Sequence, residues 1–445
     1  MCRFIVYKGV EPIQLSHLVT RPRHSIINQA FESKLRLPSS RPMNADGFGI
    51  GWYDPLPPPH PSLAGLAPHL ITSHAPPSPS HHKPGESSPP NAAEASDHAE
   101  QANILGQLDD AGEKAVRAEL VRKREEEMEL ENERPCVFKS ISPVCPGSDS
   151  ARDQGRKVRS LMAWTQGMEQ RKSYTLSGED TESTGLVRDS YSTSMVYSDI
   201  RSAHVRASTM AGAPSEDNCH PWIFDRLMFM HNGEINQFHK IKRKLQQSLP
   251  EELFLYPTGY TDSEWAFMVF LSKLKDPHAR SFSHVELRDA MMETIRFINK
   301  LSKEAGITGP SLLNYVVSDG ETVVATRYIS SRTSEASSLF FSSGTSFDEY
   351  QEGGLYRMTR ADKRENVIMI GSEPLTFERS DWMEVKTNTM LVITPKMNLL
   401  QIPIIDDFWV PPQDPASQHR SKDFAIEMGF GHGFASMDAG AIEVA

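Results

Sequence analysis

The sequence predicts an α+β domain of about 285 residues that two polar insertions interrupt. Short apolar runs bounded by turn residues, which are typical of strands, alternate with helical patterns over residues 3–53 and 195–412. Between these parts the composition changes, because residues 55–90 hold 12 of the 31 prolines and the chain is only 38% hydrophobic. Such stretches bury too little apolar surface to offset chain entropy, so we assign them to insertions and not to the core.

The part of the chain before the first insertion predicts two strands and a helical segment. Four apolar residues followed by Gly9 indicate a strand at residues 3–9. Residues 12–37 have a partly helical pattern, and the glycine-rich stretch 44–53 predicts a turn that leads into a second strand. A short apolar run at residues 136–139 indicates a third strand, where order returns.

The part of the chain from residue 195 onward predicts most of the core. Strands are expected at 227–230, 312–318, 322–328, 338–343, 366–371, 390–394 and 399–404, and helices at 238–249, 261–274 and 285–303. Thr261 and Glu264 match a capping box that starts an apolar helix. Asp319 and Gly320 lie between two apolar runs and give a strong signal for a hairpin.

These patterns predict one domain over residues 2–412. Residues 55–133 form a low-complexity and charged insertion, residues 146–193 a polar insertion, and residues 413–445 a loose tail. Within the first insertion, the mixed-charge run 113–134 predicts an exposed helix. The remaining length suits one large layered domain with no second catalytic domain.

The composition excludes several classes of protein. With 47 basic and 58 acidic residues the net charge is −11, so general nucleic-acid binding is a poor fit. The chain has no run of about 18 apolar residues that would predict a membrane span, and its start lacks the apolar core of a secretion signal. Four cysteines do not make a disulfide framework. We therefore expect a reduced, soluble, cytoplasmic protein.

Cys2 is the most informative single residue. Methionine aminopeptidase removes Met1 when the second residue is small, so the mature chain is expected to begin with a cysteine that carries both a thiol and a free α-amine. Their reference pKa values, about 8.5 and about 7.7–8.0, are close enough for the amine to act as base for the thiol near neutral pH. Alone, a cysteine at position 2 is better explained as an accidental placement, so the rest of the chain decides.

Four short motifs follow in order along the chain: HVRAST at 204–209, PSEDNCHP at 214–221, HNGEIN at 231–236 and TDSE at 261–264. Behind a cysteine at position 2, they resemble the class II glutamine amidotransferases, which are N-terminal-nucleophile hydrolases. Their order and spacing look like the glutaminase half of glucosamine-phosphate synthase, where the matching stretches read roughly HTRWATHG, PSEVNAHP, HNGIIEN and TDTE. The resemblance implies a four-layer αββα sandwich, here with two disordered or polar insertions.

Longer segments look like one subgroup of this family. MCRFIVYKG at the start of the chain, NADGFGIGWY at 44–53 and SEPLTFER at 372–379 are similar to the amidotransferase-like subunit of the fungal glutathione-degrading complex. This resemblance covers most of the core, but neither the two insertions nor the tail.

The resemblance implies a role for each matching residue. Cys2 is the nucleophile and forms a γ-glutamyl thioester. Asn232 and Gly233 form the oxyanion hole through the side-chain amide and the backbone N–H, although an Asn-Gly pair is otherwise typical of a plain turn. Arg206 binds the substrate α-carboxylate, with a surface ion pair as the alternative. Asp262 binds the α-ammonium, with an acid that stabilises the helix N-terminus as the alternative.

Lesser roles are expected for five further residues of the motifs and their surroundings. Thr209 assists at the substrate carboxylate, and His220 lines the site. His231 orients the loop and does not transfer protons. Asp46 and Gly47 shape the wall beside the nucleophile.

Two residues depart from the synthase pattern. Ala207 stands where the synthase has Trp, which leaves room for a leaving group larger than ammonia. Cys219 stands where the synthase has Ala and is expected to be a small packing residue. Cys136 and Cys145 have no metal-binding residues close in sequence, so no metal and no cofactor are expected.

The resemblance implies hydrolysis of a γ-glutamyl amide. Because the chain has no room for a synthase domain, released ammonia would have no destination in it, and we expect glutathione to be cleaved to glutamate and Cys-Gly. The fungal subunit works with a peptidase-like WD-repeat partner, so such a partner is expected, without nucleic acid or membrane. The alternatives are a glutaminase that supplies a separate synthase subunit, a thiohistidine-pathway γ-glutamyl hydrolase of the ergothioneine type, and a non-catalytic scaffold of the same fold.

Overall fold

The computed structural model describes residues 3–11, 13–32, 47–53, 134–140, 200–205, 215–361, 364–376, 378–411, 413–415 and 420–421. All of them belong to the unit formed by Met1–Pro55 and Arg134–Ala445. The two predicted insertions, the exposed helix predicted at 113–134 and most of the predicted tail lie outside the described residues. The domain boundaries therefore stay a prediction.

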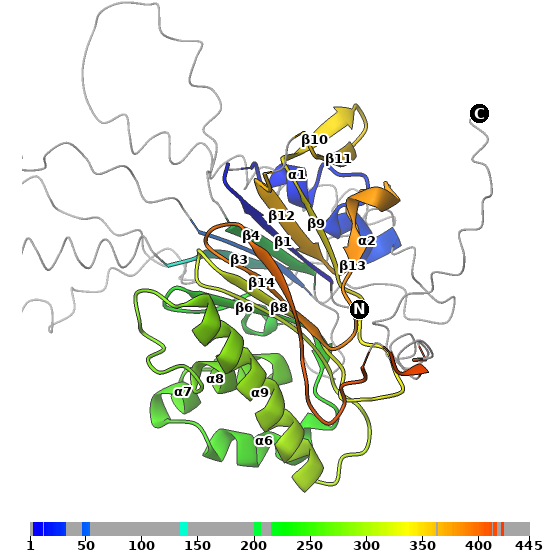
Figure 1. The fold of residues 1–445 in the computed structure, drawn as a ribbon. Coiled ribbons are helices and arrows are strands. Elements are labelled where there is room, and N and C mark those ends of the chain that lie inside the picture. Colours follow the sequence, from blue (N-terminus) through cyan, green and yellow to red (C-terminus); the bar gives the residue numbers. More distant parts are fainter. Residues whose placement is uncertain are drawn as a thin grey trace, which may run out of the picture. The chain divides into compact units, whose positions relative to one another are not determined.

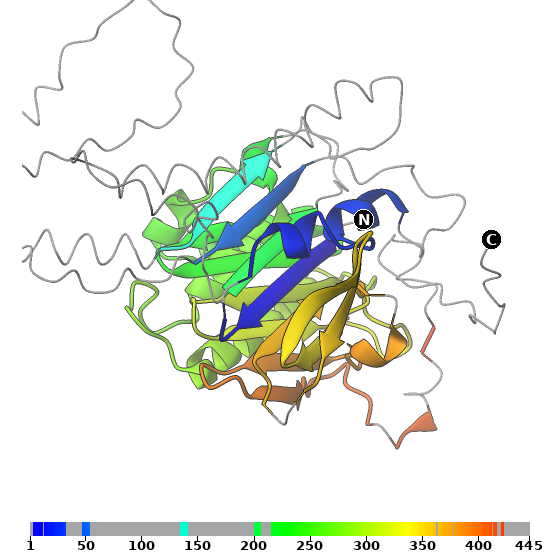
Figure 2. The ribbon, with the colours of Figure 1, turned by 90° about the horizontal axis from the view of Figure 1, so that it is seen from above.

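A seven-stranded antiparallel sheet contains the N-terminal strand near its middle. Its order is β13-β9-β12-β1-β4-β2-β3. The strands are β1 (Arg3–Gly9), β2 (Phe48–Trp52), β3 (Cys136–Ser140), β4 (Ile200–Val205), β9 (Phe340–Gly344), β12 (Val367–Gly371) and β13 (Met383–Glu384). Every residue of β1 is buried, as expected for an apolar strand with neighbours on both sides. Figure 2 shows the cyan β3 at one edge of this sheet, beside β2.

A second, six-stranded antiparallel sheet has the order β15-β14-β8-β7-β6-β5. Its strands are β5 (Trp222–Phe224), β6 (Leu227–Glu234), β7 (Leu312–Ser318), β8 (Val323–Arg327), β14 (Thr389–Ile393) and β15 (Leu399–Pro403). The predicted hairpin is confirmed between β7 and β8, where Gly320 has a φ of +93° that favours glycine. A separate two-stranded ribbon joins β10 (Ser346–Gln351) to β11 (Leu355–Thr359), and the sequence patterns did not predict it.

The helices are α1 (Ser16–Val19), α2 (Ile26–Glu32), α6 (Phe238–Gln247), α7 (Glu251–Leu255), α8 (Asp262–Leu271) and α9 (His284–Glu304), with short 3-10 turns η3 (Glu216–Asn218) and η4 (Arg379–Asp381). The predicted N-cap of α8 is confirmed, because Thr261 Oγ1 accepts the Glu264 N–H at 3.3 Å. The second half of the capping box differs. The Glu264 carboxylate accepts the N–H of Thr258 at 3.1 Å and so holds the preceding loop. Within the described ranges, every helix is too short or too polar to span a bilayer.

Three hydrophobic clusters connect these elements. One joins α6, α7, α8 and α9 to the six-stranded sheet, and a second joins α1 and α2 to the seven-stranded sheet (Figure 1). The third takes its side chains from both sheets, including Phe4 of β1, Met230 of β6 and Ile370 of β12. The fold is therefore a mixed α and β structure with antiparallel sheets, which confirms that part of the predicted fold class.

Strand β6 shows how the sheets divide their side chains. Met228 and Met230 belong to the cluster shared by both sheets, whereas Leu227 and Phe229 belong to the cluster with the helices. Successive side chains of a strand point to opposite faces, so Asn232 lies on the same face of β6 as Met228 and Met230. The strand was expected to end at residue 230, but it continues to Glu234 and includes the HNGE part of the motif.

Candidate functional site

Four strand ends meet at one end of the seven-stranded sheet, and three of them adjoin predicted site residues. Arg3, the first residue of β1, pairs with Val205, the last residue of β4, which in turn pairs with Phe48 at the start of β2. Ile5 pairs with Gly371, so β12 ends at the same place. Cys2, Arg206, Thr209 and Asp46 lie outside the described residues, but Cys2 and Arg206 directly adjoin strand ends that the register places together.

Asn232 reaches this end from the other sheet. Its side-chain amide nitrogen donates a hydrogen bond of 3.0 Å to Oγ of Ser372, the residue that follows β12. The same hydroxyl oxygen accepts the backbone N–H of Phe4 at 3.1 Å, and the Ser372 N–H donates to the Phe4 carbonyl at 3.0 Å. Asn232 is 1% exposed, and among the described residues its Oδ1 has no hydrogen-bond partner. One serine thus links the strand that follows Cys2 to the predicted oxyanion donor.

Gly233 lies where a side chain does not fit. A Cβ at this position would overlap the carbonyl oxygen of Leu312 on the paired strand and crowd Nε2 of His231. The residue is glycine here because of this close approach, and not because a turn needs one. Its backbone therefore lies tightly against β7, next to the Asn232 amide.

His231 is held by two protein partners. Its Nε2 lies 2.9 Å from the carbonyl oxygen of Leu312, and its Nδ1 lies 2.8 Å from Oγ of Ser263. A carbonyl only accepts, so Nε2 carries the proton and Nδ1 accepts from the Ser263 hydroxyl. Burial lowers the pKa of the His231 imidazole, which favours this neutral form. The ring connects β6 to β7 and α8 and has no ring nitrogen left for proton transfer.

Two carboxylates lie near the end of β6. Asp262, the first residue of α8, accepts the N–H of Ile235 at 2.7 Å through Oδ2 and the N–H of Ser263 at 2.9 Å through Oδ1. Glu234 belongs to the same strand end, and burial, followed by the nearby charge of Asp262, raises the pKa of its carboxyl. This region of the site therefore favours a cationic group on a ligand.

His220 belongs to a row of three aromatic rings in contact. Its ring centroid lies 3.8 Å from that of His204 and 4.1 Å from that of Trp222. His204 Nε2 donates to the carbonyl of His231 at 3.0 Å, which connects β4 to β6. Gly49 allows this arrangement, because a Cβ there would overlap the carbonyl of His220. The rings thus connect β4 to the start of β5, and Gly47 directly precedes β2, whose first residue pairs with the last residue of β4.

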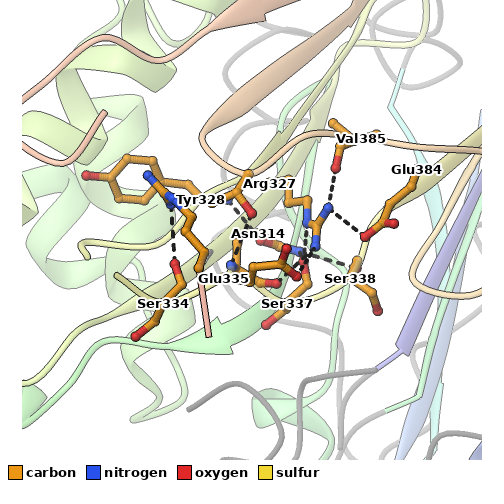
Figure 3. Close-up of polar contacts among 12 residues, drawn as sticks. Asn314, Arg327, Tyr328, Ser334, Glu335, Ser337, Ser338, Glu384 and Val385 are labelled. Atoms are coloured by element: carbon orange, nitrogen blue, oxygen red, sulfur yellow. Dashed lines mark hydrogen bonds and ion pairs between the residues drawn. The ribbon is translucent and has the colours of Figure 1, made fainter. Parts of the chain in front are cut away.

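A polar network fixes the segment that contacts Ser372, and Figure 3 shows the part of this network around Arg327. Ser338 Oγ donates to the carbonyl of Ser372 at 2.9 Å. The segment that carries Ser338 is fixed in turn, because Asn314 Nδ2 and Arg327 Nε both donate to the Ser337 carbonyl at 3.0 Å. Arg327 also forms an ion pair of 2.9 Å with Glu384. Figure 3 shows the Arg327 side chain at the centre of these contacts.

The sequence reasoning missed an ion pair next to the site. Arg3 Nε and Glu373 Oε1 form a buried ion pair, and each residue is 1% exposed. Arg3 directly follows Cys2, and Glu373 directly follows Ser372, which was also missed. The available signal was the position of this Ser-Glu pair directly after an apolar strand, in a segment already noted for its resemblance. Within the described ranges, no group of His, Cys, Asp or Glu side chains is arranged to hold a metal ion.

Comparison with known proteins gives two kinds of similarity. The sequence model of the class II glutamine amidotransferases matches residues 173–401. The chain is 38% identical over 439 residues to the Saccharomyces cerevisiae protein named probable glutamine amidotransferase DUG3, over 96% of this chain and 90% of that protein. Among solved structures, a class-II glutamine aminotransferase domain protein from Silicibacter pomeroyi has 17% identity and a TM-score of 0.42, over 91% of this chain and 100% of that one.

Proposed function

Since the chain belongs to the class II glutamine amidotransferase family, we propose that it hydrolyses a γ-glutamyl amide through a thioester on Cys2. The observation that carries this proposal is the contact of Ser372 with both Phe4 and Asn232. Phe4 lies two residues after Cys2, so this contact supports a nucleophile and an oxyanion donor that share one site. Removal of Met1 is part of the proposal, because the α-amine must be free.

The proposed reaction uses the thiol and the α-amine of Cys2 together. The amine takes the thiol proton, and the sulfur attacks the γ-carbonyl carbon of the substrate. The Asn232 amide and the Gly233 N–H stabilise the oxyanion that develops on the carbonyl oxygen. As the C–N bond breaks, the protonated amine gives its proton to the leaving nitrogen. Water then attacks the thioester, releases glutamate and restores the thiol.

Substrate binding is proposed for residues on both sides of this centre. Arg206 binds the α-carboxylate with help from Thr209, and Asp262 binds the α-ammonium. The second carboxylate at the end of β6 supports this assignment, because it adds negative potential beside Asp262. His220 lines the site through its ring row. No cofactor takes part in the proposed reaction.

We infer that glutathione is the substrate and that the products are glutamate and Cys-Gly. The support is the resemblance of the start of the chain and of the SEPLTFER segment to the fungal glutathione-degrading subunit, together with the identity to the yeast relative. The proposal includes a cytoplasmic complex with a peptidase-like WD-repeat partner. The three hydrophobic clusters support a four-layer αββα arrangement, with residues 55–133 and 146–193 as insertions in it.

A second candidate function is a glutaminase that supplies ammonia to a separate synthase subunit. The matched family is described as glutamine amidotransferases, which favours glutamine as the substrate of this second candidate. The two functions differ only in the leaving group.

The test measures glutamate release from glutathione and from glutamine by wild type and Cys2→Ala, each with and without a candidate WD-repeat subunit. We expect turnover of glutathione by wild type and none by the variant. Equal turnover by both proteins would disprove the thioester mechanism, and release from glutamine alone would select the glutaminase. Mass spectrometry of the intact N-terminus is the companion measurement, because a retained Met1 blocks the amine.

A further inference from the structure

We propose that Ser372 is a positioning residue that holds the Asn232 amide in the orientation that oxyanion binding requires. The inference rests on the proposed function and adds a residue to that site. It concerns a hydroxyl that touches the oxyanion donor and the nucleophile strand, not the substrate.

The Asn232 amide is bound to Ser372 through its nitrogen. A carboxamide has two N–H hydrogens, and the bond of 3.0 Å to Ser372 uses one of them. Among the residues that the structure describes, the other hydrogen has no acceptor and remains for a ligand. The terminal torsion of an asparagine side chain is broad, so rotation alone does not select the nitrogen face. If the amide turned over, its carbonyl oxygen would face the developing oxyanion and repel it. In the structure the nitrogen faces Ser372, whose hydroxyl oxygen accepts from both Asn232 Nδ2 and the Phe4 N–H, and this bond holds the amide in the productive orientation.

Ser372 is itself held in place, as a positioning residue must be. Ser372 and Phe4 exchange two hydrogen bonds, of 3.1 Å and 3.0 Å, and Ser338 holds the Ser372 carbonyl at 2.9 Å. Ser372 is 0% exposed, so water does not compete for its hydroxyl. Its Oγ therefore has a fixed place relative to β1 and to the strand that carries Asn232.

Phe4 connects Ser372 to the start of the chain. Phe4 follows Cys2 by two residues, and two residues of chain span at most about 7 Å. Because one oxygen accepts from both Phe4 and Asn232, Ser372 sets the separation between the nucleophile's strand and the oxyanion donor. A change at Ser372 should therefore affect the chemical step more than substrate binding.

The experiment is a double-mutant cycle on the full chain under the conditions in which wild type is active. It compares Ser372→Ala and Ser372→Thr in wild type with Ser372→Ala in an Asn232→Ala background. Each rate is divided by the amount of protein whose Cys2 reacts with a diazoketone analogue of glutamine, as measured by mass spectrometry. Misfolded protein therefore does not enter kcat. Ser343→Ala is the matched control. It removes the buried Ser343 hydroxyl, which donates to Glu365. Ser343 lies on β9 and pairs with Ile368 near the start of β12.

We expect Ser372→Ala to lower kcat by about 10- to 100-fold with little change in KM, since it misplaces one oxyanion donor without removing it. Threonine keeps the hydroxyl and should restore part of the rate, and Ser343→Ala should leave kcat unchanged. In the Asn232→Ala background, Ser372→Ala should have almost no further effect.

An unchanged kcat in Ser372→Ala would overturn the inference, and so would the same fall in both backgrounds, which would give Ser372 a structural role only. A wild type that neither cleaves a γ-glutamyl amide nor reacts with the analogue at Cys2 rejects the proposed function itself. An active wild type with an unaffected Ser372→Ala rejects the positioning role alone.

Discussion

Asp262 Oδ2 accepts the backbone N–H of Ile235 at 2.7 Å, which fastens the first residue of α8 to the end of β6. The other carboxylate oxygen is held by the N–H of Ser263. Both donors are neutral amides, so these bonds orient the negative charge without neutralising it. A carboxylate held in this way suits the recognition of an ammonium group, and the first prediction follows from it.

Asp262→Asn should raise KM by roughly 10- to 100-fold with less effect on kcat, because a hydrogen bond to a charged group contributes about 1.5–3 kcal/mol. Asparagine keeps an oxygen for Ile235, so the fold should survive. Steady-state kinetics provide the measurement. Asp276→Asn is the control, since it removes one exposed charge whose oxygen accepts the N–H of His278. An unaltered KM would assign Asp262 to stabilising the helix N-terminus alone.

Glu373→Gln should lower the free energy of unfolding by about 3–5 kcal/mol, because it removes one charge from a buried ion pair with Arg3. Urea unfolding provides the measurement. Glu293→Gln in the exposed pair with Arg296 should cost only about 0.3–0.5 kcal/mol. Similar losses in the two variants would contradict the structural importance of the buried pair.

Gly233→Ala should lower the free energy of unfolding by about 1–3 kcal/mol and reduce kcat, because the added methyl group pushes β6 away from Leu312. Thermal or urea unfolding, measured together with activity, tests this. Gly306→Asn is the control, because that glycine has open space around it and a φ of +67° that asparagine tolerates. If both variants unfold like wild type, the close approach of the Leu312 carbonyl is not a constraint.

Glu264 predicts a pH dependence of stability. Burial raises the pKa of its carboxyl from 4.5 to about 7. As pH rises, the unfolded chain therefore loses the proton first, and the stability associated with protonated Glu264 is fully present below pH 4.5 and is lost as pH rises through about 7.

Glu264→Gln should remove this pH dependence, so its unfolding free energy should fall less steeply than that of wild type between about pH 4.5 and 7. Urea titrations across this range provide the measurement. Glu286→Gln, at the corresponding capped position in the first turn of α9, should keep the wild-type slope. Parallel profiles for wild type and Glu264→Gln would refute the assignment.

The sequence was sufficient where apolar patterns were long. The strand at β12, the hairpin around Gly320 and the helix that starts after Thr261 all have strong local signals, and all are present. The ribbon of β10 and β11 was missed because most residues of β10 are exposed and show no alternation. Strand β6 was cut short for a related reason, since His231 and Asn232 are polar although they are buried.

Local patterns could not predict how the site is connected. Ser372 joins Phe4 and Asn232, which lie 368 and 140 residues away in the chain. A single serine after a strand has no sequence signature that names such partners. The family motifs identified Asn232 and Gly233, but only the structure shows that Asn232 and the start of β1 contact the same serine.

The pairing of β6 with β7 is unbroken from Met228 to Glu234. A slip of this pairing by one residue would turn Asn232 toward the helices and Met230 out of the core between the sheets. Burial of the apolar residues of β6 therefore disfavours any other register of its polar residues. A chain that has buried its core correctly has already turned the Asn232 side chain to the face between the sheets, so the proposed oxyanion donor reaches that face without a separate step after folding.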